Sequence, residues 1–415
     1  MLVIEGRIFC NGELINGAIG IEDGKIVDVK KVLKGDKRMD MGDRMILPGA
    51  VDPHVHFRDP GMTHKEDFTS GSMAALHGGV TCVLDMPNTV PSVLSIRELE
   101  DKKRTIRGRS FVDYGLYAAL TPGCDAEKLA PKVPGFKLFM GSTTGKILVD
   151  GDHDIHNAMR SAASAGKTVS VHAEDESMIR KDEEKNNRDH LRNRPASAEY
   201  NAINRLSAYK GMKINICHIT DASSVALAAS LGFTMEVTTH HMFLHDLMSD
   251  SAELKVNPPL RDKNTQEGLF KAFMEGKITM LGTDHAPHTI DEKRRTYDEA
   301  PSGIPGVETY MPMMMHMVKK GEMSINHLVK MSSSAPAEIF GMNKGSIEIG
   351  KDADLVIYDM RKIKKIRTKD LHSKAAYTPY EGRDAIFPDT VIVRGEIQLK
   401  DGELCGDMIG ADMYE

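Results

Sequence analysis

The chain has 415 residues, 40% hydrophobic and 27% charged, so it can bury a large core and is ordinary in composition for a globular protein. Its 54 Lys and Arg against 60 Asp and Glu give a net charge of −6, which disfavours a nucleic-acid partner. We see no secretory signal and no apolar run near the ~20 residues of a membrane span. Five scattered cysteines, none in a Cys-x-x-Cys pair, suit reduced thiols, so we expect a cytoplasmic protein without a cysteine zinc site.

The two ends of the chain carry strand and turn signals that the middle lacks. Asn-Gly and Asp-Gly hairpin signals interrupt β-rich runs in the first 30 residues, and similar short runs recur after residue 355. We therefore predict one small β domain built from residues 1–47 and 346–415. Residues 48–345 are expected to be inserted between these segments as the main domain.

In the middle of the chain, helical stretches repeatedly end at a glycine and lead into an apolar, β-rich run, as in buried parallel strands. Five such runs begin at Val80, Thr168, Lys213, Phe233 and Lys277. Further strands are expected near residues 51, 115 and 137, which makes eight. This α/β alternation over roughly 250 residues predicts a (β/α)8 barrel of the TIM type. A doubly wound sheet is the alternative, but no Gly-x-Gly-x-x-Gly follows the first strand.

Polar residues of one chemical kind stand where the predicted barrel strands end, which is where barrel enzymes hold their catalytic groups. His54 and His56 lie one residue apart on the first strand, so both side chains leave the same face. His172 and His218 end the fifth and sixth strands, and Asp284 ends the eighth. All five are good zinc ligands, and their placement favours a metal centre over ordinary strand histidines.

A lone lysine, Lys137, lies between apolar neighbours on the fourth strand. It could have a salt-bridge partner, but an ammonium close to Zn²⁺ would be repelled. A neutral buried lysine can instead react with CO₂ to form a carbamate, an anionic ligand able to bridge two ions. We therefore predict two Zn²⁺ per subunit bridged by N6-carboxylated Lys137, one on the first-strand histidines and Asp284, the other on His172 and His218. Two ions ~3.5–4 Å apart can hold a bridging hydroxide and polarise a carbonyl.

Six motifs carry a resemblance that covers the chain from about residue 47 to 345. They are DPHVHFRDPG (52–61), DMPNT (85–89), HAED (172–175), CHIT (217–220), KVNPPLR (255–261) and GTDHAPH (282–288). Together they closely resemble the amidohydrolase superfamily and, within it, the type I dihydroorotases. The resemblance implies reversible cyclisation of N-carbamoyl-L-aspartate to L-dihydroorotate and water, a step of pyrimidine (UMP) synthesis, by way of a hydroxide that bridges two metal ions.

The resemblance also implies residue roles. Asp284 would take a proton from the bridging hydroxide as it attacks the ring amide and pass it to the leaving nitrogen. The expected substrate contacts are Arg58, Asn88 and His288 for the carboxylate and Asn257, Ser302 and Gly303 for the ring. Many type I enzymes carry a bridging aspartate a little beyond the fourth strand, but residues 141–146 read GSTTGK. This favours Lys137 as the bridge, with Asp150 and Asp152 as fallback candidates.

Two other functions remain as alternatives. A hydantoinase, dihydropyrimidinase or allantoinase would share the metal centre, but its substrate lacks the ring carboxylate for which Arg58 is suited. A catalytically inactive barrel could instead serve as the partner of a transcarbamoylase, although such proteins usually lose ligands that this chain retains. We expect a small-molecule substrate, and leave open a homodimer and association with a transcarbamoylase.

Overall fold

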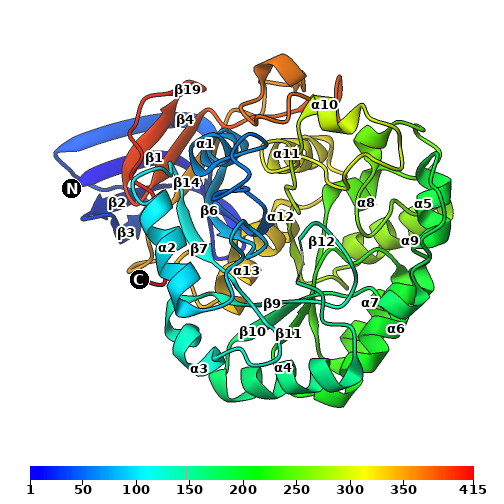
Figure 1. The fold of residues 1–415 in the computed structure, drawn as a ribbon. Coiled ribbons are helices and arrows are strands. Elements are labelled where there is room, and N and C mark those ends of the chain that lie inside the picture. Colours follow the sequence, from blue (N-terminus) through cyan, green and yellow to red (C-terminus); the bar gives the residue numbers. More distant parts are fainter. Residues whose placement is uncertain (146) are drawn as a thin grey trace.

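A computed structural model describes residues 1–145 and 147–415 of the chain. A ring of strands and surrounding helices occupies most of the molecule, and a separate sheet lies at one side, close to both ends of the chain (Figure 1). In the part of the chain that the structure describes, no helix combines the length and hydropathy required to cross a membrane.

The separate sheet has eight strands drawn from both ends of the chain, in the order β19-β18-β17-β14-β4-β1-β2-β3. Its strands are β1 (Leu2–Cys10), β2 (Glu13–Glu22), β3 (Lys25–Lys30), β4 (Lys37–Pro48), β14 (Leu355–Tyr358), β17 (Thr390–Val393), β18 (Glu396–Lys400) and β19 (Glu403–Leu404). The two ends meet at β4, which pairs parallel with β1 and antiparallel with β14. Residues with positive φ turn the first hairpins, at Asn11-Gly12 and Asp23-Gly24, as those dipeptides predict.

The ring is a barrel of parallel strands. These are β5 (Ala50–Val55), β6 (Val80–Asp85), β7 (Asp113–Leu116), β8 (Ala118–Ala119), β9 (Gly135–Phe139), β10 (Thr168–His172), β11 (Ile214–Ile216), β12 (Thr234–Val237) and β13 (Met280–Leu281). β7 pairs with β6, and β8, directly after it, pairs with β9, so the two pieces share the third strand position. A bridge between Val55 and His285 closes the ring. The predicted (β/α)8 barrel is confirmed.

Helices surround the barrel and connect its strands (Figure 1). They are α1 (Phe68–Gly78), α2 (Ile96–Ile106), α3 (Ala126–Leu129), α4 (Asp152–Ala165), α5 (Asn187–Asn193), α6 (Ala196–Arg205), α7 (Ala222–Leu231), α8 (Thr239–Phe243), α9 (Lys263–Met274), α10 (Ile290–Lys293), α11 (Tyr310–Lys320), α12 (Ile325–Val329) and α13 (Ala335–Ile339). Three of these helices end at a glycine, as the sequence predicts. Gly79, Gly166 and Gly232 end α1, α4 and α7 in the left-handed conformation.

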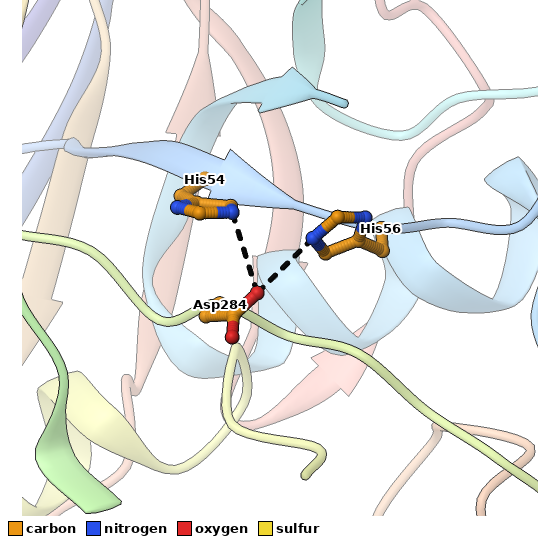
Figure 2. A group of neighbouring side chains, drawn as sticks. All are labelled: His54, His56 and Asp284. Atoms are coloured by element: carbon orange, nitrogen blue, oxygen red, sulfur yellow. Dashed lines mark ion pairs between the residues drawn. The ribbon is translucent and has the colours of Figure 1, made fainter. Parts of the chain in front are cut away.

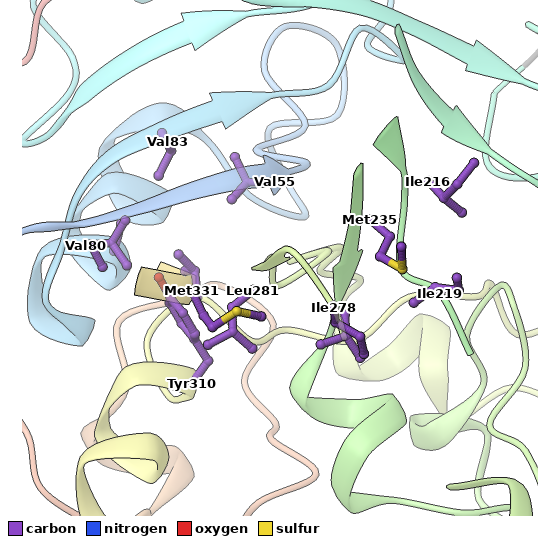
Figure 3. Close-up of a cluster of buried hydrophobic side chains, with 14 of the residues drawn as sticks. Val55, Val80, Val83, Ile216, Ile219, Met235, Ile278, Leu281, Tyr310 and Met331 are labelled. Carbon is purple, nitrogen blue, oxygen red and sulfur yellow. The ribbon is translucent and has the colours of Figure 1, made fainter. Parts of the chain in front are cut away.

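Apolar side chains from the strands and from the outer helices form one large core (Figure 3). Val55 and Val83 of the strands pack in the same cluster as Tyr310 and Met331 from the helical layer, and each is at most 1% exposed. Burial of such a side chain stabilises the fold by roughly 1.5–3 kcal/mol. The strand ends therefore rise from a rigid, close-packed base, which is what a precisely placed set of polar side chains requires.

We propose that residues 1–47 with 346–415 form a small domain and that residues 48–345 form the barrel domain. The sheet strands support this division, although β4 continues to Pro48. Parts of the second segment also pack on the barrel. The Ile386 N–H donates to the Pro312 carbonyl of α11, and residues 411–413 run along β7, where the backbone groups of Tyr114 bond to Ala411 at 2.9 Å and to Met413 at 2.8 Å.

Candidate active site

The first strand and the loop after the eighth bring three of the predicted ligands together (Figure 2). His54 lies on β5, and His56 follows one residue after the end of that strand. The Asp284 Oδ1 atom lies 3.3 Å from His54 Nε2 and 3.1 Å from His56 Nε2. All three residues are buried. One metal ion could therefore contact two imidazoles and one carboxylate here.

The histidines that end β10 and β11 complete the cluster. His172 Nδ1 lies 3.0 Å from His218 Nε2, and the ring centres of His218 and His54 are 5.4 Å apart. His218 and Asp284 have positive φ values of 38° and 46°. Such conformations cost energy in residues other than glycine and concentrate at functional sites. The structure thus gathers all four predicted histidines and Asp284 in one buried place.

The first-strand imidazoles are held from behind by oxygen atoms. The His54 Nδ1 is hydrogen-bonded to a carboxylate oxygen of Glu236, and the His56 Nδ1 lies 2.8 Å from the Asn88 Oδ1. An oxygen behind Nδ1 selects the tautomer that carries the proton on Nδ1, so the Nε2 lone pair faces the shared space. This is how metal-bound histidines are oriented, so the residues present fit metal binding.

His172 is hydrogen-bonded to a carboxylate through its other ring nitrogen, Nε2, instead of Nδ1. Its Nε2 lies 2.8 Å from Glu174, which leaves Nδ1 facing His218. Burial alone would raise the pKa of Glu174, but the guanidinium of Arg194, 2.6 Å away, and His172 itself hold that pKa well below its usual range. Glu174 is therefore a permanent anion behind this imidazole.

Lys137, on β9, is fully buried beside this cluster. Its Nζ lies 2.9 Å from Cys217 Sγ, and no carboxylate within the described ranges is at ion-pair distance from it, which argues against a salt-bridge role. The fallback residues lie elsewhere, because Asp150 is exposed and the Asp152 side chain is 90% exposed and paired with Arg205. A buried lysine without an anion suits conversion into an anionic carbamate.

Arg58 lies two residues after His56 in the sequence and is only 2% exposed. Its Nε donates to the Pro287 carbonyl at 3.2 Å, and its Nη2 lies 3.3 Å from His288 Nε2. Burial lowers its pKa. Among the residues that the structure describes, none supplies it with a carboxylate partner. A buried guanidinium in this state is ready for an anionic group from a ligand.

Of the two other residues predicted to bind the carboxylate, His288 lies beside Arg58, and Asn88 lies beside His56. His288 lies 3.1 Å from Lys65 Nζ through Nδ1 and 3.0 Å from the Ser302 carbonyl through Nε2. Burial, with the cations Arg58 and Lys65, lowers the pKa of His288 to about 3, so the ring is neutral at neutral pH. Asn88 donates its amide to the Thr144 carbonyl at 2.8 Å.

The residues predicted to touch the ring are partly engaged with the protein. Asn257 Oδ1 lies 2.8 Å from His190 Nε2. Gly303, with φ of 150°, donates its N–H to the Lys255 carbonyl and accepts hydrogen bonds from Lys293 and Tyr377 at 3.0 Å each. A ligand would have to replace one of these bonds to use the backbone of Gly303.

Glu236, a carboxylate in the apolar run of β12, is a site residue that was not predicted from the sequence. Its position inside a strand is the same kind of signal that identified Lys137. With Cys217 and His54 it brings three ligand-type atoms within 4.8 Å of one another. Lys65, which contacts His288, has no comparable signal in the sequence.

Histidines and an aspartate lie together at the strand ends of this parallel barrel. This arrangement is typical of a barrel hydrolase whose residues can bind a metal ion. The chain belongs to the amidohydrolase family, whose model matches residues 45–397. It is 37% identical to a dihydroorotase of Thermoplasma volcanium, over 98% of this chain and 96% of that protein. It is 36% identical to a dihydroorotase of Pyrococcus furiosus, over 98% of this chain and 94% of that protein.

Solved structures with the same fold carry other names. An L-hydantoinase (dihydropyrimidinase) from Arthrobacter aurescens superposes with a TM-score of 0.92 and 25% identity, covering 99% of this chain and 98% of its own. A D-hydantoinase has a TM-score of 0.90 and 26% identity, covering 100% and 98%. This chain thus shares its fold with the hydantoinases, and its sequence is more similar to the dihydroorotases.

Proposed function

We propose that this hydrolase is a dihydroorotase, which interconverts L-dihydroorotate and N-carbamoyl-L-aspartate in pyrimidine synthesis. The observation that carries the proposal is Arg58, a buried cation beside the histidine cluster without an acidic partner in the described residues. L-Dihydroorotate supplies the missing carboxylate on the same ring as the amide that must be opened. The identity of 36–38% with dihydroorotases over nearly the whole chain supports the same function.

In this reaction the oxygen of a water molecule attacks the ring amide carbon and the carbon–nitrogen bond breaks. Arg58, Asn88 and His288 would hold the substrate carboxylate so that the amide lies over the histidine cluster, while Asn257 and the backbone of residues 302–303 would contact the ring. Asp284 would take a proton from the attacking water and return it to the leaving ring nitrogen, which balances the step. The reverse sequence cyclises N-carbamoyl-L-aspartate and releases water.

We propose two Zn²⁺ per subunit, one on His54, His56 and Asp284 and one on His172 and His218, with carboxylated Lys137 as the shared ligand. The oriented lone pairs of the imidazoles support this set, as does buried Lys137, which has no carboxylate at ion-pair distance within the described residues. When bound, the ions would polarise the amide carbonyl and lower the pKa of a water molecule to about 7.

Lys137→Ala should lower kcat by about 1000-fold or more, because the shared anionic ligand is lost. Short carboxylates such as propionate, which place two oxygens in the vacated space, should restore part of the rate. Metal content measured by elemental analysis should fall below that of the wild-type protein. Asp152→Ala, which changes an exposed aspartate, is the control and should keep both rate and metal. Full activity of Lys137→Ala would contradict the bridging role.

The function is tested by ring opening of L-dihydroorotate with zinc-loaded protein, measured beside dihydrouracil, hydantoin and allantoin. Activity on L-dihydroorotate alone would support the proposal. Activity on a ring without a carboxylate would instead favour the second candidate, a cyclic amidase like the hydantoinases that share the fold. No activity on any of the four, with metal bound, would favour an inactive scaffold, a function that the retained ligand set disfavours.

We also propose a cytoplasmic location, which five unpaired cysteines support. A small-molecule substrate agrees with the hydrolase family of the chain. A homodimer and an association with a transcarbamoylase stay predictions.

A further inference from the structure

The backbone between His56 and Arg58 is hydrogen-bonded to the neighbouring strand, β6. The Phe57 N–H donates to Asp85 Oδ1 at 2.7 Å, and the Met86 N–H donates to the Val55 carbonyl at 2.9 Å. Arg58 has φ of 60°, a backbone conformation that is uncommon for residues other than glycine and that the surrounding contacts must stabilise. Asp85 binds the residue directly before this turn, so its carboxylate is one of the groups that stabilise the conformation.

Asp85 is in turn held by a helix outside the barrel. Lys102 of α2 reaches inward, and its Nζ lies 2.5 Å from Asp85 Oδ2 and 3.3 Å from the Met86 carbonyl. Lys102 is 1% exposed and Asp85 is fully buried. Each carboxylate oxygen of Asp85 therefore accepts a different hydrogen bond, one from the Lys102 ammonium and one from the Phe57 N–H. A charge pair taken fully out of water costs desolvation energy, so burial of the pair is by itself weak evidence that it stabilises the fold. What distinguishes this pair is its contact with the backbone beside Arg58.

We propose that Lys102 is a positioning residue for the substrate carboxylate. By fixing the rotation of the Asp85 carboxylate, Lys102 fixes the Phe57 N–H and with it the turn that presents Arg58 to His288. The inference rests on the proposed function, because it assumes that Arg58 binds the carboxylate. Lys102 itself does not touch the reacting atoms, and it acts on substrate binding through Asp85 and the turn.

The adjacent residue offers a matched control. Lys103 is also buried on α2, and its Nζ forms an ion pair with Asp412 at 2.7 Å, with side chains 6% and 3% exposed. Asp412 belongs to the segment that runs along β7 and has no part in the proposed site. Lys102→Met and Lys103→Met therefore remove the same charge from a buried pair on the same helix, and only the first pair contacts the Arg58 turn.

The test compares kcat and KM for L-dihydroorotate, together with Tm, in the wild-type protein, Lys102→Met and Lys103→Met. We expect Lys102→Met to raise KM by about tenfold or more while kcat changes by less than about threefold, because a misplaced Arg58 weakens carboxylate binding. Lys103→Met should lower Tm and leave KM unchanged. Hydantoin, which has no carboxylate, should show no KM difference between the two variants if the wild-type protein opens it at all.

A second variant guards against a loss of folding in Lys102→Met. Asp85→Asn/Lys102→Met removes both charges, so no uncompensated charge is left buried. We expect its Tm to recover toward that of Lys103→Met while KM stays high, because nothing then selects the amide oxygen over the amide nitrogen for the Phe57 N–H. A KM equal to the wild-type value in both Lys102 variants would overturn the inference alone. Wild-type protein that opens only carboxylate-free rings would overturn the proposed function, and the inference with it.

Discussion

Replacing Asp284 with Asn should lower kcat/KM for L-dihydroorotate by about 1000-fold or more. The amide cannot accept the proton of the attacking water, and general acid–base catalysis contributes about 10²–10⁴-fold. It is also a poorer ligand between the imidazoles of His54 and His56, which lie 3.3 and 3.1 Å from Asp284 Oδ1. Steady-state rates of ring opening and of cyclisation measure the effect, and both should fall equally because one proton carrier serves both directions.

We expect this variant to fold. Asp284 has φ of 46°, and Asn is among the residues that tolerate the left-handed region. Its Tm should therefore stay close to that of the wild-type protein, and circular dichroism should be unchanged. Asp152→Asn, at an exposed site paired with Arg205, is the control and should keep full activity. A rate of Asp284→Asn within tenfold of the wild-type rate would exclude Asp284 as the proton carrier.

Arg58→Met should lower kcat/KM for L-dihydroorotate by about 100-fold, equivalent to about 2.7 kcal/mol. Met keeps the length and apolar stem of Arg but removes the cation that we assign to the substrate carboxylate. Most of the loss should appear in KM, since the charge binds the substrate equally before and during ring opening. The kinetics of hydrolysis over a range of L-dihydroorotate concentrations measure this.

Two comparisons make the Arg58 result specific. Arg58→Lys keeps the charge without the two-pronged geometry and should lie between the wild-type protein and Arg58→Met. Any hydrolysis of a carboxylate-free ring, such as dihydrouracil, should be unaffected or improved. An equal loss on both kinds of ring would mean that Arg58 supports the fold or the histidine cluster rather than recognising a carboxylate.

Site residues can be recognised from the sequence where a polar side chain stands in or beside an apolar run. His54, His56 and Lys137 are polar side chains at or just beyond apolar runs, and the repeated helix–glycine–strand units place those runs in one barrel. Lys102 shows no such signal, because α2 is a charged helix in which a lysine is expected to face solvent. Only the fold reveals that this lysine points inward to Asp85.

The β-rich ends show the same limit at the level of strands. Hairpin dipeptides and β-branched runs predict that both ends are sheet, and the eight-stranded sheet contains both. They do not predict that β4 lies between β1 and β14, because strand order depends on packing between distant segments. Nor do they predict that residues 411–413 leave the sheet and bond to Tyr114 of β7.

That arrangement constrains how the chain folds as the ribosome makes it. Strands β1 to β4 emerge first, yet Met45 of β4 pairs with Tyr358, so one edge of β4 stays open until most of the chain has been synthesised. The edge of β7 that bonds to Ala411 stays unpaired until the last residues have been synthesised. Pairings between such distant segments fold slowly, and unpaired strand edges are prone to aggregation. Early translation products of this chain are therefore expected to depend on chaperones, although the finished barrel has no open edge there.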